Sequence, residues 1–282
     1  MRCAVLVVLV LELAGAMGGR PPARQAQPSA ASTPAQRAYE KGNALFKEKR
    51  LRESFAALEE ALAADPNHVP ALTLKARIAI AAGLFDVARE SLQRAIAADP
   101  TSGYARFLLG YEYYLLNDWD HALSELRTAQ KLNTRDARIS VYLGMTYESL
   151  GDTQNAISSY QEAIRQEEVA GAVELNTVLT YSQFLLLQGR LSDCTQVLNK
   201  ALQLYPGSRD VHYALGRLLL ERGDPRGAAK EGEKALLLPS QDVGDLQIRY
   251  LLVRAYEAAG DDRLAAKHAD TIKAAETPKP AQ

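Results

Sequence analysis

Hydrophobic residues recur along most of the chain at spacings of three and four, the pattern of amphipathic α-helices. In residues 137–170, Leu143, Tyr147 and Leu150 share one face of a first predicted helix. Gly151 predicts its end, because glycine adopts the left-handed conformation at little cost, and Asp152 predicts the N-cap of a second helix. The apolar face of that second helix comprises Ala156, Ile157, Tyr160, Ala163 and Ile164. No stretch alternates with a period of two residues, so the sequence predicts no β-sheet.

This pair of helices repeats along the chain with a period of 34 residues. The residues that recur at this spacing include Pro66 with Pro100, Gly110 with Gly144, Ala88 with Ala122 and Ala156, and Gly189 with Gly223. A fixed period of this size predicts a solenoid of stacked supersecondary units. We place seven units at residues 35–68, 69–102, 103–136, 137–170, 175–208, 209–242 and 246–279, with short loop insertions near 171–174 and 243–245.

Small residues recur where the two helices of a unit must approach closely, because a larger side chain would force them apart. In the first helices they are Gly42, Ala76, Gly110, Gly144, Ser182 and Gly216. In the second helices they are Ser54, Ala88, Ala122, Ala156, Cys194, Ala228 and Ala265. The place of Cys194 in this series predicts a small buried residue and not a reactive thiol.

A specific motif recurs within the units. Leu143-Gly144-x-x-Tyr147 is followed by Ala156, Tyr160 and Ala163, the preceding unit repeats this spacing, and Pro66, Pro100 and Pro206 lie near unit ends. Over residues 35–279 this pattern resembles the tetratricopeptide repeat (TPR) family. The resemblance implies an all-α fold, a right-handed superhelical solenoid of antiparallel helix pairs. The sequence departs from the pattern at Lys49, which replaces the glycine between the helices, and at Thr134 and Glu168, which replace the terminal proline.

The ends of the chain differ from the repeats. Met1-Arg2, an apolar run from Ala4 to Leu11 and the Ala14-x-Ala16 site have the order of a secretory signal peptide, so we expect residues 1–16 to be cleaved. The apolar run is too short to span a bilayer. Residues 17–34 are rich in Pro and Ala, and we expect them to form a disordered tether. We expect residues 280–282 to form a disordered tail. We expect an exported bacterial protein, periplasmic or secreted; the alternative is an apolar N-terminal tail on a protein that is not exported.

Composition and motifs argue against several functional classes. Thirty-three Lys+Arg against 34 Asp+Glu give a net charge of −1 without a basic stripe, which argues against nucleic-acid binding. No phosphate-binding, nucleophile-elbow or H-E-x-x-H motif occurs, so we expect no enzymatic activity and no cofactor. The four histidines lie in different units without metal-ligand spacing, and we expect no metal site. We place them at the surface or at helix ends: His68, His121, His212 and His268.

The resemblance also implies where a partner binds. In the TPR family the first helix of each unit lines a concave groove, and residues at i, i+4 and i+7 face the ligand. The corresponding residues here are Tyr39, Asn43, Phe46, Arg77, Tyr104, Phe107, Tyr111, Tyr114, Arg138, Gln183, Tyr213, Arg217, Tyr250 and Arg254. Aromatic and Arg side chains dominate interface energetics. The alternative for any single tyrosine is packing between adjacent units.

One specialised binding mode of the family is absent. Members that bind the C-terminal carboxylates of cytosolic chaperones use Lys and Asn, then Asn, then Lys and Arg over three units. Here only Asn43 is retained, and the other positions hold Tyr39, Leu74, Tyr104 and Leu108. A cytosolic co-chaperone role is therefore disfavoured.

Together these observations favour a non-catalytic scaffold that binds a protein or an extended peptide in the groove. The alternative is an extracytoplasmic protein that binds a glycan or small ligand, stacked on the aromatic residues of the third unit: Tyr104, Phe107, Tyr111 and Tyr114.

Overall fold

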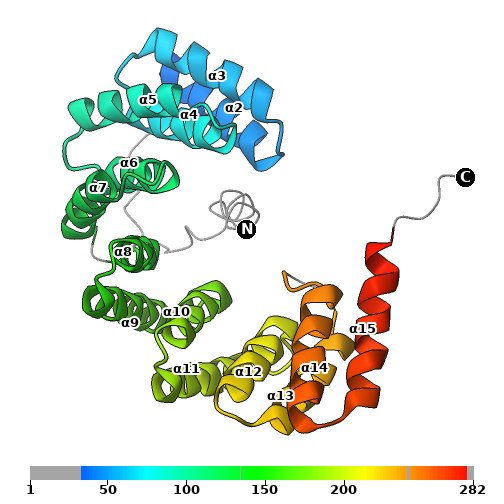
Figure 1. Cartoon of the computed structure of the whole chain (residues 1–282). Coiled ribbons are helices and arrows are strands. Elements are labelled where there is room, and N and C mark those ends of the chain that lie inside the picture. The colour runs from blue at the N-terminus through cyan, green and yellow to red at the C-terminus, as the bar shows by residue number, and fades with distance from the viewer. Residues whose placement is uncertain (1–32, 134, 240–241, 278–282) are drawn as a thin grey trace, which may run out of the picture. The chain divides into compact units, whose positions relative to one another are not determined.

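The computed structural model describes residues 33–133, 135–239 and 242–277 of the 282-residue chain. These residues form fourteen α-helices and no strand (Figure 1). The first helices of the pairs are α2 (Pro34–Lys47), α4 (Val69–Ala81), α6 (Gly103–Leu115), α8 (Ala137–Ser149), α10 (Leu175–Leu187), α12 (Arg209–Glu221) and α14 (Asp245–Ala259). The second helices are α3 (Leu51–Ala64), α5 (Phe85–Ala98), α7 (Trp119–Leu132), α9 (Thr153–Ala170), α11 (Leu191–Leu204), α13 (Pro225–Leu237) and α15 (Asp262–Glu276). The predicted all-α fold is confirmed.

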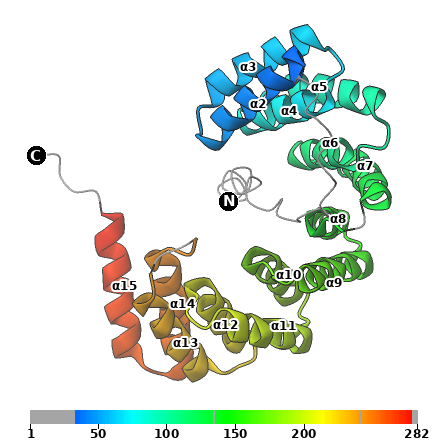
Figure 2. The same ribbon diagram turned by 180° about the vertical axis from the view of Figure 1, so that it is seen from behind.

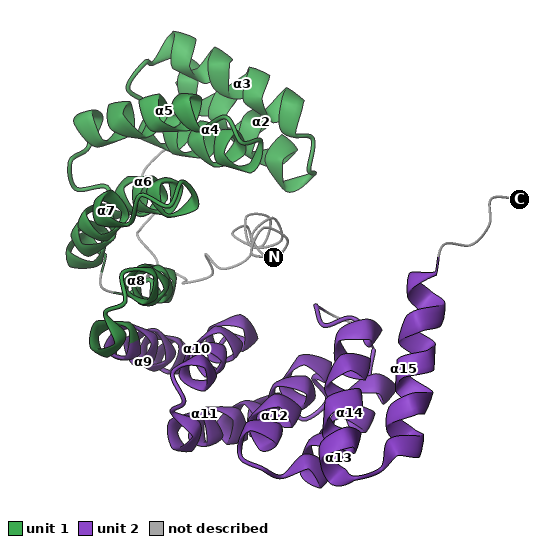
Figure 3. Cartoon of the chain, in the orientation of Figure 1, with its two compact units in different colours: residues 1–156 green, residues 157–282 purple. Residues whose placement is uncertain are grey.

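The chain divides into two compact units, unit 1 with residues 1–156 and unit 2 with residues 157–282 (Figure 3). Within unit 1 each second helix packs against its own first helix and against the first helix of the next pair, as α3 does on α2 and α4. Within unit 2, α11 and α13 do the same with α12 and α14. Each unit is therefore a stack of helix pairs that share apolar surface with their sequence neighbours, which is how a solenoid is built.

First helices of successive pairs also contact one another directly. In unit 1, α2 contacts α4, α4 contacts α6, and α6 contacts α8. In unit 2, α10 contacts α12, and α12 contacts α14. The α2–α4 neighbours lie side by side from both directions of view (Figures 1 and 2). Each unit consequently has one face built only from first helices, which we call its first-helix face.

The turn inside each pair depends on one residue with positive φ. These residues are Lys49, Gly83, Asn117, Gly151, Gly189, Gly223 and Gly260. Glycine reaches this conformation without steric cost and asparagine at little cost, whereas Lys49, with φ of 61°, bears the full penalty of a side chain. The second helix then begins with an aspartate cap in four of the pairs: Asp118, Asp152, Asp224 and Asp261.

The small residues hold the helices of each pair in close contact. The Ser54 hydroxyl donates to the Gly42 carbonyl at 2.7 Å, and both residues are buried. A Cβ atom on Gly110 would lie 2.8 Å from Cγ and 3.1 Å from the backbone nitrogen of Leu126, too close for either to accommodate without movement. A larger residue at these positions would separate the helices of the pair.

Residues 171–174 form the connection between α9 and α10, but the added length of this repeat lies in α9. The α9–α10 connection has the same four residues as α3–α4, but α9 has 18 residues where α3, α5, α7 and α11 have 14. A loop lies where the insertion was expected but is of ordinary length, and about one additional turn of α9 accounts for the four extra residues. The second expected insertion lies in a loop, the connection 238–244 between α13 and α14.

Buried charged side chains fix both connections. Glu167 accepts hydrogen bonds from the Thr177 hydroxyl at 2.6 Å and from the Glu174 backbone N–H at 3.0 Å. Burial raises the pKa of Glu167, and these two bonds offset only part of that rise. In the other connection, buried Arg209 donates to the Leu238 carbonyl at 3.0 Å, and buried Asp210 accepts from the Val243 N–H at 3.1 Å.

The proposed signal peptide 1–16, most of the tether and the tail 280–282 lie outside the described residues. The tether ends earlier than expected, because α2 begins at Pro34 and the Thr33 hydroxyl caps it by accepting from the Gln36 N–H at 3.1 Å. Within the part of the chain that the structure describes, no helix is long and apolar enough to cross a membrane.

Candidate partner-binding surface

All candidate groove residues lie on first helices, but the two units carry them separately. Unit 1 holds nine: Tyr39, Asn43, Phe46, Arg77, Tyr104, Phe107, Tyr111, Tyr114 and Arg138. Unit 2 holds five: Gln183, Tyr213, Arg217, Tyr250 and Arg254. The contacts between first helices form one face in each unit, and the burial of each side chain decides whether it is accessible there.

Two of the aromatic candidates are packing residues. Phe107 is 0% and Tyr111 1% exposed, so neither can touch a partner. Both rings pack on Tyr142 of α8, at centroid distances of 5.7 Å and 4.8 Å respectively, and Tyr114 packs on it at 5.6 Å. The expectation that Phe107 and Tyr111 face a ligand is wrong, because these rings join α6 to α8. The sequence analysis did not identify Tyr142, the residue on which the cluster is centred.

Arg138 of α8 packs on two aromatic rings of α6. Its guanidinium lies 5.8 Å from the ring centroid of Tyr104 and 5.3 Å from that of Phe107. It also donates two hydrogen bonds to Asp136, from Nε at 2.8 Å and from Nη2 at 2.6 Å. A bidentate pair of this kind neutralises the charge locally, so Arg138 presents a planar, largely compensated surface.

Arg77 connects the first two pairs. Its guanidinium lies 4.8 Å from the ring centroid of Phe46, so that a cation–π contact joins α4 to α2. Tyr39, about two turns before Phe46 on α2, packs on His68 with a centroid distance of 5.3 Å. The partly exposed members of the candidate set in the first three pairs are Tyr39, Asn43, Phe46, Arg77, Tyr104 and Tyr114.

The first-helix face of unit 2 has fewer aromatic contacts. The Arg217 guanidinium lies 5.9 Å from the ring of Tyr213 on the same helix. Tyr250 is 49% exposed and donates to Glu276 at 2.6 Å, and Arg254 pairs with Glu221 at 3.6 Å, an exposed and therefore weak ion pair. Gln183 is exposed. These residues are accessible to a partner, but they do not form a cluster comparable to that of unit 1.

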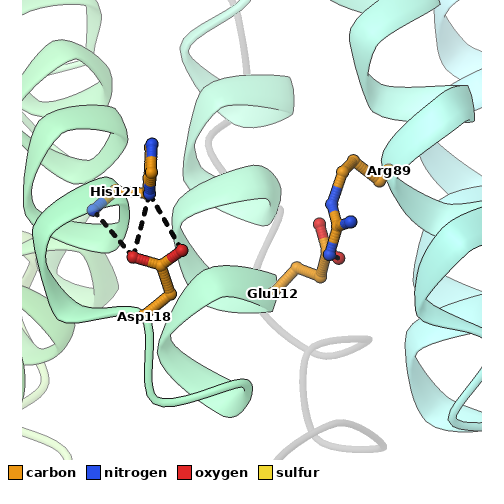
Figure 4. A network of polar contacts seen from close by, with 4 residues as sticks. All are labelled: Arg89, Glu112, Asp118 and His121. Atoms are coloured by element: carbon orange, nitrogen blue, oxygen red, sulfur yellow. Dashed lines mark hydrogen bonds and ion pairs between the residues drawn. The ribbon is translucent and has the colours of Figure 1, made fainter.

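A polar network outside the candidate groove joins α5, α6 and α7 (Figure 4). Arg89 donates to the fully buried Glu112 at 2.7 Å, and Asp118 contacts the His121 ring nitrogen at 2.8 Å. Tyr113 lies between the two halves, with Arg89 5.5 Å from its ring and His121 stacked on it at 5.0 Å. The sequence signal for this network is the glutamate at position 112 in an otherwise apolar and aromatic stretch of α6.

Two histidines are buried, contrary to expectation. The imidazole of His212 lies 2.6 Å from a Glu231 oxygen and 3.1 Å from the Pro206 carbonyl. His268 lies 3.1 Å from Glu233 and 3.3 Å from Arg249. The hydrogen-bond partners of both histidines lie on other helices or in turns. The residues adjacent to each histidine in the sequence therefore do not predict its burial. As expected, His68 lies at a helix end, where it caps α4, and His121 is exposed.

No cluster in the described residues suggests a metal centre, since no group of three or more His, Cys, Asp or Glu side chains converges there. The only cysteine among these residues is Cys194, which is buried as predicted. Burial raises the pKa of its thiol to about 11, which keeps the thiol protonated at neutral pH.

Several solved structures share this fold. A TPR protein of Thermus thermophilus is 24% identical, and the match covers 66% of this chain and 99% of that one with a TM-score of 0.53. A TPR protein of Parabacteroides merdae is 15% identical, with coverages of 87% and 94% and a TM-score of 0.63. The type IV pilus biogenesis factor PilW is 16% identical, with coverages of 73% and 92% and a TM-score of 0.61. At these identities the likeness extends to the fold alone.

Family profiles described as tetratricopeptide repeat match residues 45–107, 107–171 and 175–218, which together make up more than half of the chain. A search of the curated proteins found no match. The profiles, the seven helix pairs and the structural relatives agree, and the chain belongs to the tetratricopeptide repeat family.

Proposed function

We propose that this protein is a non-catalytic scaffold that binds an extended peptide, or a segment of a partner protein, along the first-helix face. The fold supports a role in protein interaction, since stacked repeats present long surfaces suited to polymers. We choose this face because of a group of aromatic and arginine side chains in unit 1. There Tyr39, Phe46, Arg77 and Tyr104, from three successive first helices, are all partly exposed. Aromatic and arginine side chains of this kind dominate binding energies.

Glycan binding is the weaker alternative. Stacking on a sugar requires exposed aromatic rings with polar groups beside them for the hydroxyls. Burial removes Phe107 and Tyr111 from the aromatic set on which that alternative depends. Tyr104 and Tyr114 keep partial exposure, but Tyr114 already packs on Tyr142 and on Trp119.

We also propose that the scaffold acts outside the cytoplasm, in the bacterial envelope or secreted. This proposal rests on the order of segments in residues 1–16, namely a positive residue, an apolar run and a small-residue cleavage site. N-terminal mass spectrometry of protein recovered from fractionated cells tests it. A mature N-terminus at Met17 is expected, whereas an intact Met1 in the cytoplasmic fraction would contradict export.

The binding proposal is tested by crosslinking and affinity purification of the full-length protein from its own cells. The variant Tyr39→Ala/Tyr104→Ala removes two accessible rings from the first-helix face, and Arg52→Ala/Lys131→Ala removes exposed residues from second helices as a control. A partner protein that is lost with the first variant and kept with the second supports the proposal. A partner retained equally by both variants would place binding on another surface.

A further inference from the structure

Three consecutive turns of unit 1 expose large apolar side chains. Leu84 follows the positive-φ residue of the α4–α5 turn, and Leu116 and Leu150 precede those of the α6–α7 and α8–α9 turns. Their exposed fractions are 51%, 40% and 40% respectively. Phe85 and Trp119, the first residues of α5 and α7, are partly exposed as well. We call these five residues the leucine edge of unit 1.

The turns themselves do not require these leucines. In the first, fifth and sixth pairs, the residues on either side of the positive-φ residue are charged or carry an amide: Glu48 and Arg50, Gln188 and Arg190, Arg222 and Asp224. Each of those turns still has its residue at positive φ. A single exposed leucine is ordinary on a protein surface, but a row of them at consecutive pairs indicates an interaction surface.

The leucine edge is bordered by acidic residues alone. No Lys or Arg occurs in the three turns or in the helix ends beside them, residues 78–88, 113–124 and 146–158. The acidic residues of these segments are Asp86, Asp118, Asp120, Glu148 and Asp152. The turn of the first pair has the opposite character, with Lys47, Lys49, Arg50 and Arg52. The negative charge therefore coincides with the three turns that expose leucine.

Two of these carboxylates are available to a partner. Asp86 is fully exposed, and its contact with Arg89 at 3.8 Å is weak, because Arg89 is bound to α6. Asp120 is exposed and has no ion-pair partner among the described residues. Asp118, in contrast, contacts the His121 ring at 2.8 Å (Figure 4). A partner of complementary charge therefore presents lysine or arginine beside its apolar residues.

The spacing of the row favours a helical partner. α4 contacts α6 and α6 contacts α8, and contacting helices lie about 8–10 Å apart, so the three leucines follow one another at about this spacing. Seven residues of an α-helix rise about 10 Å, so a helix with an apolar residue at every seventh position matches the row. Side chains on one face of an extended strand recur about every 7 Å, which does not match.

We propose that the leucine edge is a second interaction surface, which binds a basic amphipathic helix of a partner protein. The apolar face of that helix packs on Leu84, Leu116 and Leu150, and its lysine or arginine side chains approach Asp86 and Asp120. This surface lies at the turns within the pairs and is separate from the first-helix face. It goes beyond the proposed function, because the scaffold then holds two segments of different conformation at once.

The test uses an unlabelled peptide of three Leu-Lys-Lys-Leu-Ala-Lys-Ala heptads with blocked ends. A second peptide has Glu for each Lys, and a third has the residues of the first in an order without an apolar face. Trp119 is the only tryptophan of the chain and lies on the leucine edge, so its emission reports binding at this place. The Lys peptide is expected to shift this emission of the full-length protein to shorter wavelength. It should bind at least about tenfold more tightly than either other peptide.

Matched variants separate recognition from folding. Leu116→Gln/Leu150→Gln places at two turns the residue type that Gln188 provides in the fifth pair, so the thermal midpoint should stay unchanged. The same variant should weaken the Lys peptide about tenfold or more. The control Leu132→Gln/Leu204→Gln changes leucines of similar exposure, 41% and 48%, at the C-terminal ends of second helices, away from the turns. It should bind the Lys peptide as wild type does.

A second pair of variants tests the charges. Asp86→Asn/Asp120→Asn should reduce the preference for the Lys peptide over the Glu peptide severalfold. Glu257→Gln/Asp270→Asn removes two exposed charges from unit 2 and should leave that preference unchanged.

Several outcomes would overturn the proposal. Equal affinity for the Lys and Glu peptides would do so, as would binding that leaves the Trp119 emission unchanged or that both leucine variants weaken alike. Without peptide binding, co-sedimentation with phosphatidylcholine vesicles that Leu116→Gln/Leu150→Gln loses would assign the edge to a membrane surface. A dimer in sedimentation equilibrium that the same variant abolishes would assign it to a second copy of the chain.

The two interaction surfaces are tested separately. Tyr39→Ala/Tyr104→Ala should bind the Lys peptide as wild type does, and a loss of binding would place the peptide on the first-helix face and overturn the leucine edge as its site. If that variant keeps its crosslinked partner and Leu116→Gln/Leu150→Gln loses the Lys peptide, the leucine edge stands and the proposed role of the first-helix face is wrong.

Discussion

Arg89 and Glu112 form a charge pair that joins α5 to α6. Nη2 of Arg89 lies 2.7 Å from Oε1 of Glu112, and the glutamate side chain is fully buried whereas that of Arg89 keeps 31% exposure. The second carboxylate oxygen has no hydrogen-bond partner among the described residues. Burial raises the pKa of Glu112, and the hydrogen bond and charge of Arg89 offset only part of the rise. Formation of the pair therefore costs desolvation free energy, and the fully buried Glu112 is desolvated more than the partly exposed Arg89.

Removing Arg89 should destabilise the protein more than removing the pair. Arg89→Met leaves a buried carboxylate without a counter-charge, and we expect a loss of about 3 kcal/mol in the free energy of unfolding. The double variant Arg89→Met/Glu112→Leu should recover most of that loss, because two apolar side chains replace two desolvated charges. Urea denaturation followed by circular dichroism measures both.

The exposed pair of Lys41 and Glu60, 3.4 Å apart with both side chains 61% exposed, provides the control. Lys41→Met should leave the unfolding midpoint within error, since an exposed pair is screened by water and salt. For the buried pair, an Arg89→Met/Glu112→Leu variant as unstable as Arg89→Met alone would contradict this prediction. It would show that the ion pair itself, and not the desolvated charge, determines the stability.

Lys49→Gly should stabilise the first helix pair. Lys49 holds φ at 61°, a conformation that costs a non-glycine residue about 1 kcal/mol, and glycine occupies the equivalent place in most pairs. Relief of this strain exceeds the entropic cost of glycine in the unfolded chain, so a gain of about 0.5–1 kcal/mol is expected. Amide hydrogen exchange in α2 and α3 should slow accordingly. Asn117→Gly is the matched control and should gain less, because asparagine tolerates positive φ; an equal gain would point to a cause other than side-chain strain.

The sequence predicts the helix pairs well because their determinants are local. The apolar spacing defines the faces of the helices, and the residue with positive φ at Gly83 or Gly151 marks each turn. The sequence does not predict that the extra residues before 175 lengthen α9, since nothing local distinguishes an additional turn of this helix from a loop. Only the contacts of Glu167 with Glu174 and Thr177 show how the longer helix joins α10.

The binding surface is less predictable, because exposure depends on the neighbouring pair. Tyr104 and Phe107 look equivalent in the pattern of α6, yet Phe107 is buried against Tyr142 and Tyr104 remains partly exposed. Likewise Arg77 and Arg138 both belong to the groove face predicted from the sequence. Only the three-dimensional contacts show that one is paired by Asp136 and the other has no acidic partner in the described chain.

The stability of the sixth pair should depend on acid pH through Glu231. The buried His212 ring lies between two oxygen atoms, with Nδ1 at 2.6 Å from the Glu231 carboxylate and Nε2 at 3.1 Å from the Pro206 carbonyl. Burial tends to raise the pKa of Glu231, but hydrogen bonds from Lys234 and His212 outweigh burial and hold that pKa below its usual 4.5.

A carboxyl group whose pKa is lower in the folded state stabilises the fold above its unfolded pKa, and this contribution disappears as pH falls through the folded pKa. Unfolding midpoints measured from pH about 7 down to about 3 should therefore fall more steeply for wild type than for Glu231→Gln. The two curves should converge at the acid end. Parallel curves over the whole range would mean that Glu231 titrates alike in the folded and unfolded chains.

The thiol of Cys194 donates to the Ser182 carbonyl at 3.4 Å and is 1% exposed. It occupies the position of Ala88 and Ala156 in other pairs, so Cys194→Ala should cost less than about 1 kcal/mol. Cys194→Leu should cost about 1–3 kcal/mol, because its branches would press on the α10 backbone. With a pKa of about 11, the native thiol should resist Ellman's reagent at about pH 8 and react only at the rate at which α10 and α11 separate. Labelling rates measured against urea concentration check this. Rapid labelling without denaturant, at a rate independent of urea, would show that Cys194 is accessible in the folded protein.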